Sequence, residues 1–84
     1  MPAVEKILAQ ILRGGSDANI AFNDLRRLLI HLGFSERTKG GHHIFRRAGI
    51  PTLINLQKDG SDAKPYQVRQ VRRIILEHGL AGEV

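Results

Sequence analysis

The sequence contains no cysteine, few aromatic residues and no long apolar run. Without cysteine, the chain can form no disulfide, no thiolate nucleophile and no cysteine-ligated zinc site. With three Phe, one Tyr and no Trp, it has too few aromatic rings to stack successive bases of a single-stranded nucleic acid. No segment approaches the roughly 20 apolar residues of a membrane-spanning helix. We therefore expect a cytoplasmic protein in a reducing compartment.

Positive charge is in excess and is unevenly distributed along the chain. The 84 residues carry a net charge of +5, which favours an anionic partner for a single small domain. Between residues 34 and 56, basic side chains are opposed by only one acid, Glu36. The basic residues of this segment are Arg37, Lys39, Arg46 and Arg47. A solvated surface would also carry such a cluster, so charge alone leaves both interpretations open.

Apolar residues recur at helical spacing in three segments. The first helix is expected over about residues 4–13, and the second begins near Asn23, a good N-cap, and ends before Gly33. The third helix is expected over about residues 65–77, with a proline in its first turn. The leucine stripe of the second helix is interpreted as core.

Three shorter segments are expected to be strands, over residues 34–39, 42–47 and 52–56. Gly40-Gly41 supplies the first turn, and residues 57–64 are expected to be a polar loop. The order α-α-β-β-β-α predicts an α+β fold in which two helices cover one face of an antiparallel sheet. The other face needs no apolar cover and can carry function.

The most specific motif is the two-glycine turn followed by two histidines, residues 40–43. Adjacent residues on a strand point to opposite faces, so only one of the two histidines lies on the open face. Burial of Phe45 would turn His43 inward as a packing residue and leave His42 outward. Ile44 shares a face with His42 and favours the opposite arrangement, but we predict that His42 faces outward and that His43 packs inward. In either case the two histidines cannot share one metal ion on a regular strand, so no metal site is expected.

A histidine beside basic residues fits phosphodiester chemistry. RNA carries its own nucleophile, the 2′-hydroxyl, and its cleavage needs a base, an acid and a cation near the phosphate. His42 is the candidate acid/base group, and Arg46, Lys39 and Arg37 are the nearest candidate phosphate contacts. A surface histidine without function is the alternative.

The last helix places its basic residues largely opposite its apolar arc. These residues are Arg69, Arg72 and Arg73, and Lys64 lies near the start of the helix. Such a face can contact a phosphate backbone or form salt bridges with an acidic partner protein. The spacing alone does not decide between these two partners.

Three parts of the sequence carry a resemblance to a known family. They are Leu32-Gly33-Phe34 after the leucine-striped helix, the run Lys39-Gly40-Gly41-His42-His43-Ile44-Phe45, and Ala63-Lys64-Pro65-Tyr66-Gln67-Val68 before the basic helix. Over about residues 23–80 the chain resembles the HicA-like toxins of bacterial and archaeal toxin–antitoxin pairs. The resemblance implies a double-stranded-RNA-binding-like α-β-β-β-α fold and an mRNA interferase, an endoribonuclease that cuts messages. It implies no cofactor.

The family motif, Gly-Ser-His with an aromatic residue three positions later, maps onto Gly40, His42 and Phe45. The resemblance therefore implies that His42 is catalytic, while Gly41 stands where the family has serine. It also implies a HicB-like antitoxin as partner. The RNA contacts that we predict are Lys39, Gly40, Gly41, Arg46, Arg37, Lys64, Arg69, Arg72 and Arg73.

We divide the chain into an N-terminal helix with its linker, residues 1–20, and a HicA-like RNA-binding and ribonuclease domain, residues 21–84. The first helix lies outside the minimal family domain and would serve a homodimer or antitoxin docking. Two other functions fit the sequence. One is an RNA-binding module of the same fold in which His42 only contacts the backbone, and the other is an interaction protein whose basic helix meets an acidic partner.

Overall fold

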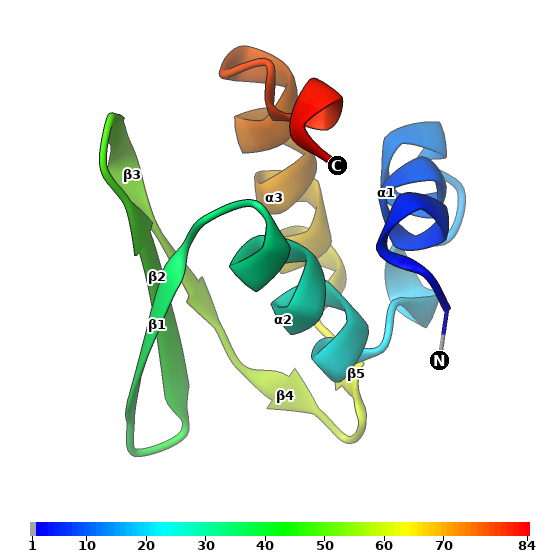
Figure 1. The fold of residues 1–84 in the computed structure, drawn as a ribbon. Coiled ribbons are helices and arrows are strands. Elements are labelled where there is room, and N and C mark those ends of the chain that lie inside the picture. The colour runs from blue at the N-terminus through cyan, green and yellow to red at the C-terminus, as the bar shows by residue number, and fades with distance from the viewer. Residues whose placement is uncertain (1) are drawn as a thin grey trace.

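Three helices and a three-stranded antiparallel sheet make up the fold of this computed structural model, which describes residues 2–84 (Figure 1). The helices are α1 (Val4–Arg13), α2 (Phe22–His31) and α3 (Pro65–Glu77), and the strands of the sheet are β1 (Ser35–Lys39), β2 (His42–Arg47) and β3 (Ile50–Leu56). A small hairpin, β4 (Lys58–Asp59) and β5 (Asp62–Ala63), and two short 3-10 helices, η1 (Asp17–Asn19) and η2 (Leu80–Glu83), complete the chain. The predicted double-stranded-RNA-binding-like fold with an additional N-terminal helix is confirmed.

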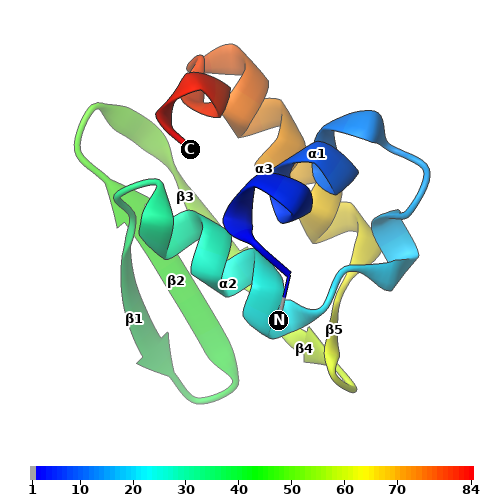
Figure 2. The same cartoon turned by 45° about the vertical axis from the view of Figure 1, so that its right-hand side comes forward.

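The sheet has the order β1-β2-β3, and α2 and α3 lie on the same face of it (Figures 1 and 2). Phe45 of β2 and Ile54 and Leu56 of β3 project from this face and are fully buried. In the register of the sheet, Phe45 lies opposite Ile54, and His43 lies opposite Leu56. The other face of the sheet carries no helix, as predicted from the element order.

Each helix contributes an apolar stripe to the same core. In α2 the stripe is Leu25, Leu28 and Leu29, all fully buried, and the helix is followed by Gly33 at φ 89°. That left-handed conformation suits glycine and ends the helix where the sequence predicted. In α3 the stripe is Val68, Val71, Ile74 and Ile75. Helix α3 begins at a proline whose missing N–H would have no intrahelical partner in any case.

The N-terminal helix belongs to this core. Ile7, Leu8 and Ile11 of α1 are buried in one cluster with residues of the sheet and of both other helices. The apolar side of α1 is therefore occupied within the chain, and a contact with a second copy or an antitoxin would have to use its polar side. The division of the chain at residue 20 stays a prediction.

Some of the expected boundaries were wrong. Helix α2 begins at Phe22, with Ala21 as N-cap, and Asn23 already lies inside the helix. Phe22 is buried, and its side chain adds a further apolar residue, three positions before Leu25, to the inner stripe of the helix. Strand β3 begins at Ile50, which pairs with Arg47 next to an irregularity in the register. Ile50 is also buried, so the strand starts two residues before the expected start at residue 52.

The expected loop of residues 57–64 contains the β4–β5 hairpin. Its turn includes Gly60 at φ 65°, and its second strand carries the buried Ala63. The backbone N–H of Ala63 donates to the Ile20 carbonyl oxygen at 2.9 Å, and that of Phe22 donates to the Ser61 carbonyl oxygen at 3.0 Å. These bonds attach the hairpin to the start of α2. Within the described part of the chain, no helix has the length and apolar character needed to cross a membrane.

An ion pair connects α3 to the segment that follows α1. Both terminal nitrogens of Arg72 donate to the carboxylate of Asp17, at 2.9 and 3.1 Å, and Nη1 also donates to the Ile11 carbonyl oxygen at 3.0 Å. The hydrogen bonds from Arg72 lower the pKa of Asp17 against the opposing effect of its desolvation. The same bonds raise the pKa of Arg72. The bidentate pair thus joins α3 to η1, and the bond to the Ile11 carbonyl joins α3 to α1.

We expect Asp17→Asn to lower the free energy of unfolding by about 1–2 kcal/mol at pH 7, because it removes a charged partner of Arg72. The folded-state pKa of Asp17 lies below its unfolded-state value, so this contribution is complete above about pH 5. It is lost as the pH falls through the folded-state pKa. Urea unfolding at pH 7 and at about pH 2 measures the difference.

Asp59→Asn is the matched control, because Asp59 is exposed and makes no ion pair with any of residues 2–84. Equal stability of Asp17→Asn and wild type at pH 7 would contradict a stabilising role for this ion pair.

Candidate functional site

His42 begins strand β2 and lies on the uncovered face of the sheet, exposed to solvent. It is opposite Lys39 of β1, and two positions further along the same face Ile44 is opposite Arg37. Arg46 follows on this face and is also exposed. The predicted orientation of His42 is therefore found in the structure, as is the fully buried Phe45 that was expected to impose it.

Two amide side chains contact the His42 ring. Asn55 Oδ1 lies 3.3 Å from Nδ1, and since an amide oxygen can only accept, this contact favours the tautomer that carries its proton on Nδ1. Gln57 Nε2 lies 3.3 Å from Nδ1 and 3.2 Å from Nε2. Because these two distances are nearly equal, Gln57 does not select a tautomer. Asn55 thus leaves Nε2 as the nitrogen able to accept a proton.

Gln57 joins His42 to helix α3. Lys64 Nζ donates to Gln57 Oε1 at 3.2 Å, and the Gln57 backbone N–H donates to Gln67 Oε1, also at 3.2 Å. Gln67 is 1% exposed and is the buried polar side chain of α3. A buried amide that accepts a backbone hydrogen bond fixes the chain at that point. The end of β3 is thereby held against the start of α3.

Asn55, Gln57 and Gln67 were not predicted as parts of the site from the sequence. A weak signal was present for two of them. Asn55 alternates with buried residues on β3 and so had to face outward, and Gln67 is a polar residue within the buried side of α3. Nothing in the local sequence linked Gln57 to His42, which lies 15 positions earlier.

His43 points to the opposite side of β2 and is half-buried, in agreement with the predicted packing role. Its ring meets the Phe22 ring edge-on, with 4.7 Å between the centroids. Its Nδ1 also lies 2.9 Å from Glu36 Oε2, and Glu36 Oε1 accepts from Arg26 Nε at 2.6 Å. Desolvation of Glu36 opposes ionisation, but the hydrogen bonds from His43 and Arg26 outweigh it and lower the pKa of Glu36. His43 is thus a packing residue with an ionic partner.

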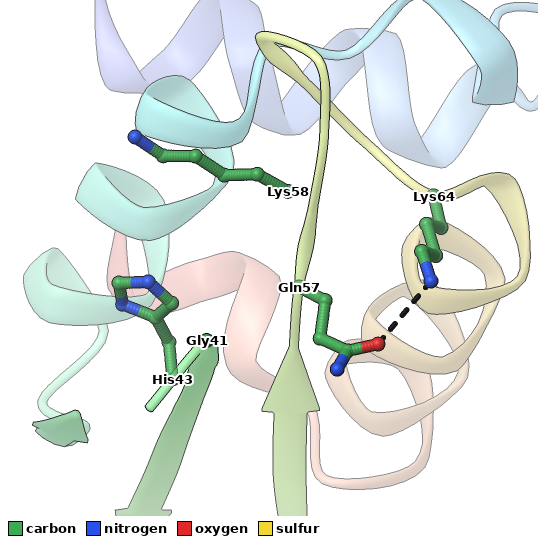
Figure 3. Close-up of a pocket in the computed structure, with 5 residues that line it drawn as sticks. All are labelled: Gly41, His43, Gln57, Lys58 and Lys64. Carbon is green, nitrogen blue, oxygen red and sulfur yellow. Dashed lines mark hydrogen bonds between the residues drawn. The ribbon is translucent and has the colours of Figure 1, made fainter. Parts of the chain in front are cut away.

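Two hollows adjoin the histidine hairpin. The first, which we call the hairpin pocket, has a volume of about 410 Å³ and is lined by Gly41, His43, Gln57, Lys58 and Lys64 (Figure 3). The second, the sheet-face hollow, has a volume of about 320 Å³ and is lined by Ser35, Glu36, Arg37, Ile44, Arg46 and Leu53. The first lies at the turn end of the hairpin, and the second lies further along β1 and β2.

The predicted RNA contacts fall into separate groups. Lys39, Arg37 and Arg46 lie on the same face as His42, and Gly40 and Gly41 form the turn beside it. Lys64 reaches this site through Gln57.

Arg69 and Arg73 are exposed on the outer side of α3, on a surface that the helix separates from the sheet. Arg72 differs from both, because Asp17 and the Ile11 carbonyl occupy its guanidinium group. The expectation that all three guanidinium groups project freely from one helix face is therefore corrected for Arg72. Among residues 2–84, no group of three or more His, Asp or Glu side chains is arranged to hold a metal ion.

Comparison with protein-family models assigns most of the chain to one family. The model of the HicA toxin of bacterial toxin–antitoxin systems matches residues 22–78. The chain belongs to the HicA toxin family. The resemblance inferred from the sequence is thus confirmed. No curated protein and no solved structure gives a match.

Membership makes this protein a toxin of a toxin–antitoxin system, for which an antitoxin is the partner. The matched segment contains both histidines of the hairpin, Gln57 and α3 up to its end. Helix α1 lies outside the match, although its apolar residues lie in the same core.

We predict that the two glycines of the turn differ sharply in their tolerance of a side chain. Gly40 has φ 61°, so Gly40→Ala should cost about 1 kcal/mol of the free energy of unfolding. Gly41 has no positive φ, and a Cβ placed there would meet nothing within 4 Å. Gly41→Ser, which restores the residue typical of the family, should therefore leave stability unchanged.

Urea unfolding of both variants at neutral pH checks this prediction. A loss of stability in Gly41→Ser equal to that in Gly40→Ala would show that the turn excludes side chains at both positions.

Proposed function

We propose that this toxin is an mRNA interferase, an endoribonuclease that uses His42 as its general acid/base. The observation that carries the proposal is the position of His42 on an uncovered sheet face among basic side chains. Lys39 lies directly opposite His42, and Arg37 and Arg46 follow along the face. Glu36, the acidic residue of the three strands, also lines the sheet-face hollow, but its carboxylate is bound to His43 and Arg26.

The proposed reaction uses the nucleophile that RNA carries. His42 Nε2 removes the proton of a 2′-hydroxyl, whose oxygen attacks the adjacent phosphorus. A 2′,3′-cyclic phosphate forms, the bond from phosphorus to the 5′-oxygen breaks, and the imidazolium returns its proton to that leaving oxygen. Arg46 and Lys39 stabilise the additional negative charge on the phosphorane. The contact of Asn55 with Nδ1 supports this scheme, because it favours the tautomer in which Nε2 carries no proton.

We further propose that a HicB-like antitoxin inhibits the toxin by covering this face. The sheet-face hollow combines apolar and basic groups: Leu53 is 46% exposed and Ile44 is half-buried, between Arg37 and Arg46. A partner with apolar side chains flanked by carboxylates would complement this surface. Such a partner would also block access to His42.

In this proposal the RNA strand binds mainly along the uncovered sheet face. Gly40, Gly41 and Lys64 contact it at the turn end of the hairpin. Arg69 and Arg73 would contact longer RNA that extends around α3. Arg72 is left out, because its guanidinium group is bound to Asp17.

We expect His42→Ala to abolish cleavage of purified RNA and growth arrest on induction, since the base and acid are then missing. His31→Ala is the matched control, because His31 is an exposed histidine on α2 away from the sheet face. Mapping of new RNA ends measures cleavage, and the growth curve after induction measures toxicity.

Cleavage by His42→Ala at the wild-type rate would overturn the assignment of His42. RNA binding without new ends in the wild-type protein would instead indicate the non-enzymatic RNA-binding module.

We expect the double variant Arg37→Gln/Arg46→Gln to weaken binding of a short RNA and to make that binding less dependent on salt. Each lost phosphate contact on a single strand should reduce the slope of log K against log salt by about 0.7. Fluorescence anisotropy across a salt series measures the slope. The comparison pair Arg69→Gln/Arg73→Gln removes the same charge from α3, and an equal effect there would contradict RNA binding centred on the sheet face.

A further inference from the structure

The hairpin pocket is lined by basic and neutral residues, with no carboxylate in its lining. Three of its five lining residues, His43, Lys58 and Lys64, can carry positive charge, and Gln57 and Gly41 are neutral. The view in Figure 3 shows His43 and Lys58 on one side of the chain at Gln57 and Lys64 on the other. A pocket that gathers cations around about 410 Å³ is suited to an anion.

Each basic side chain of this pocket is held by a contact of its own. His43 is bound through Nδ1 to Glu36 and packs against Phe22, while Nε2 makes no hydrogen bond to any of residues 2–84. Lys58 Nζ lies 5.4 Å from the centroid of the Phe22 ring. Lys64 Nζ donates to Gln57 Oε1. Side chains that are already positioned lose less conformational freedom when a ligand binds.

The turn at Gly41 adds access for a ligand. Gly41 lines the pocket and is exposed, and a Cβ at this position would meet nothing within 4 Å, so no side chain crowds the backbone there. Gln57 lines the pocket and also contacts the His42 ring at 3.2 Å. A single side-chain amide therefore separates an anion in the pocket from His42.

We propose that the hairpin pocket binds a second phosphate of the RNA, next to the phosphate that is cut at His42. His43 and Lys58 are the new contacts in this assignment, and His43 acts there as a binding residue held by Glu36. The pocket would fix the register of the RNA strand, so that the 2′-hydroxyl lies at His42. This inference rests on the proposed function, because it presumes RNA as the ligand of the sheet face.

The test uses Lys58→Met, which keeps most of the alkyl stem but removes the charge. Its matched control is Lys6→Met, an exposed lysine of α1. RNA affinity is measured in the His42→Ala background, so that the oligonucleotide stays intact. We expect Lys58→Met to weaken binding by about tenfold and Lys6→Met to have little effect.

A set of oligonucleotides then carries one neutral methylphosphonate at successive positions around the site that the wild-type toxin cleaves. At one position next to that site, the methylphosphonate should weaken binding to the parent protein and remove the difference between the parent and Lys58→Met. His43→Gln should show the same loss of sensitivity at the same position. Should His43→Gln fail to fold, Lys58→Met still decides the question, because Lys58 is an exposed side chain.

The proposal fails if Lys58→Met binds RNA as Lys6→Met does, or if no single linkage removes its effect. It also fails if Lys58→Met weakens binding of the antitoxin and leaves RNA affinity unchanged, since the pocket is then a protein interface. These results are separate from the proposed function, which fails when the wild-type toxin produces no new RNA ends.

Discussion

Burial of Phe45 between the sheet and the helices determines how the hairpin is displayed. Once this ring enters the core with Ile54 and Leu56, strand alternation places His43 on the inner side of β2 and His42 on the outer side. A shift of the register by one residue would exchange the two histidines and expose the ring. The apolar core therefore sets the geometry of the candidate site, although none of its residues takes part in the proposed chemistry.

Much of the fold followed from periodicity, because each helix and strand presents a stripe or alternation that local sequence reveals. The orientation of His42 could be predicted for the same reason, from a buried aromatic residue three positions away. The polar contacts between distant residues could not be predicted from the sequence. Gln57 meets His42 across 15 positions and Arg72 meets Asp17 across 55, so both depend on how separate elements pack. The spacing of Arg72 placed it on an exposed basic face of α3, but its guanidinium group is bound to Asp17, in the segment that follows α1.

The two histidines, alike in sequence, occupy different chemical surroundings. His42 is exposed, and the hydrogen-bond partners of its ring within residues 2–84 are the neutral amides of Asn55 and Gln57. His43 is half-buried against an aromatic ring and shares a carboxylate with Arg26. His43 can both pack in the fold and bind a ligand. Its Nδ1 is bound to Glu36, whereas its Nε2 makes no hydrogen bond to any of residues 2–84.

The sheet also has two edges, formed by its outer strands β1 and β3. Strand β1 is short, and four of its five residues are exposed, among them Arg37 and Lys39. Repulsion between these charges opposes edge-to-edge pairing of two copies, and Pro51 removes one donor from the β3 edge. The same positive edge would attract a strand that carries carboxylates. The basic residues near His42 would thus oppose pairing of two copies and favour pairing with a chain of opposite charge.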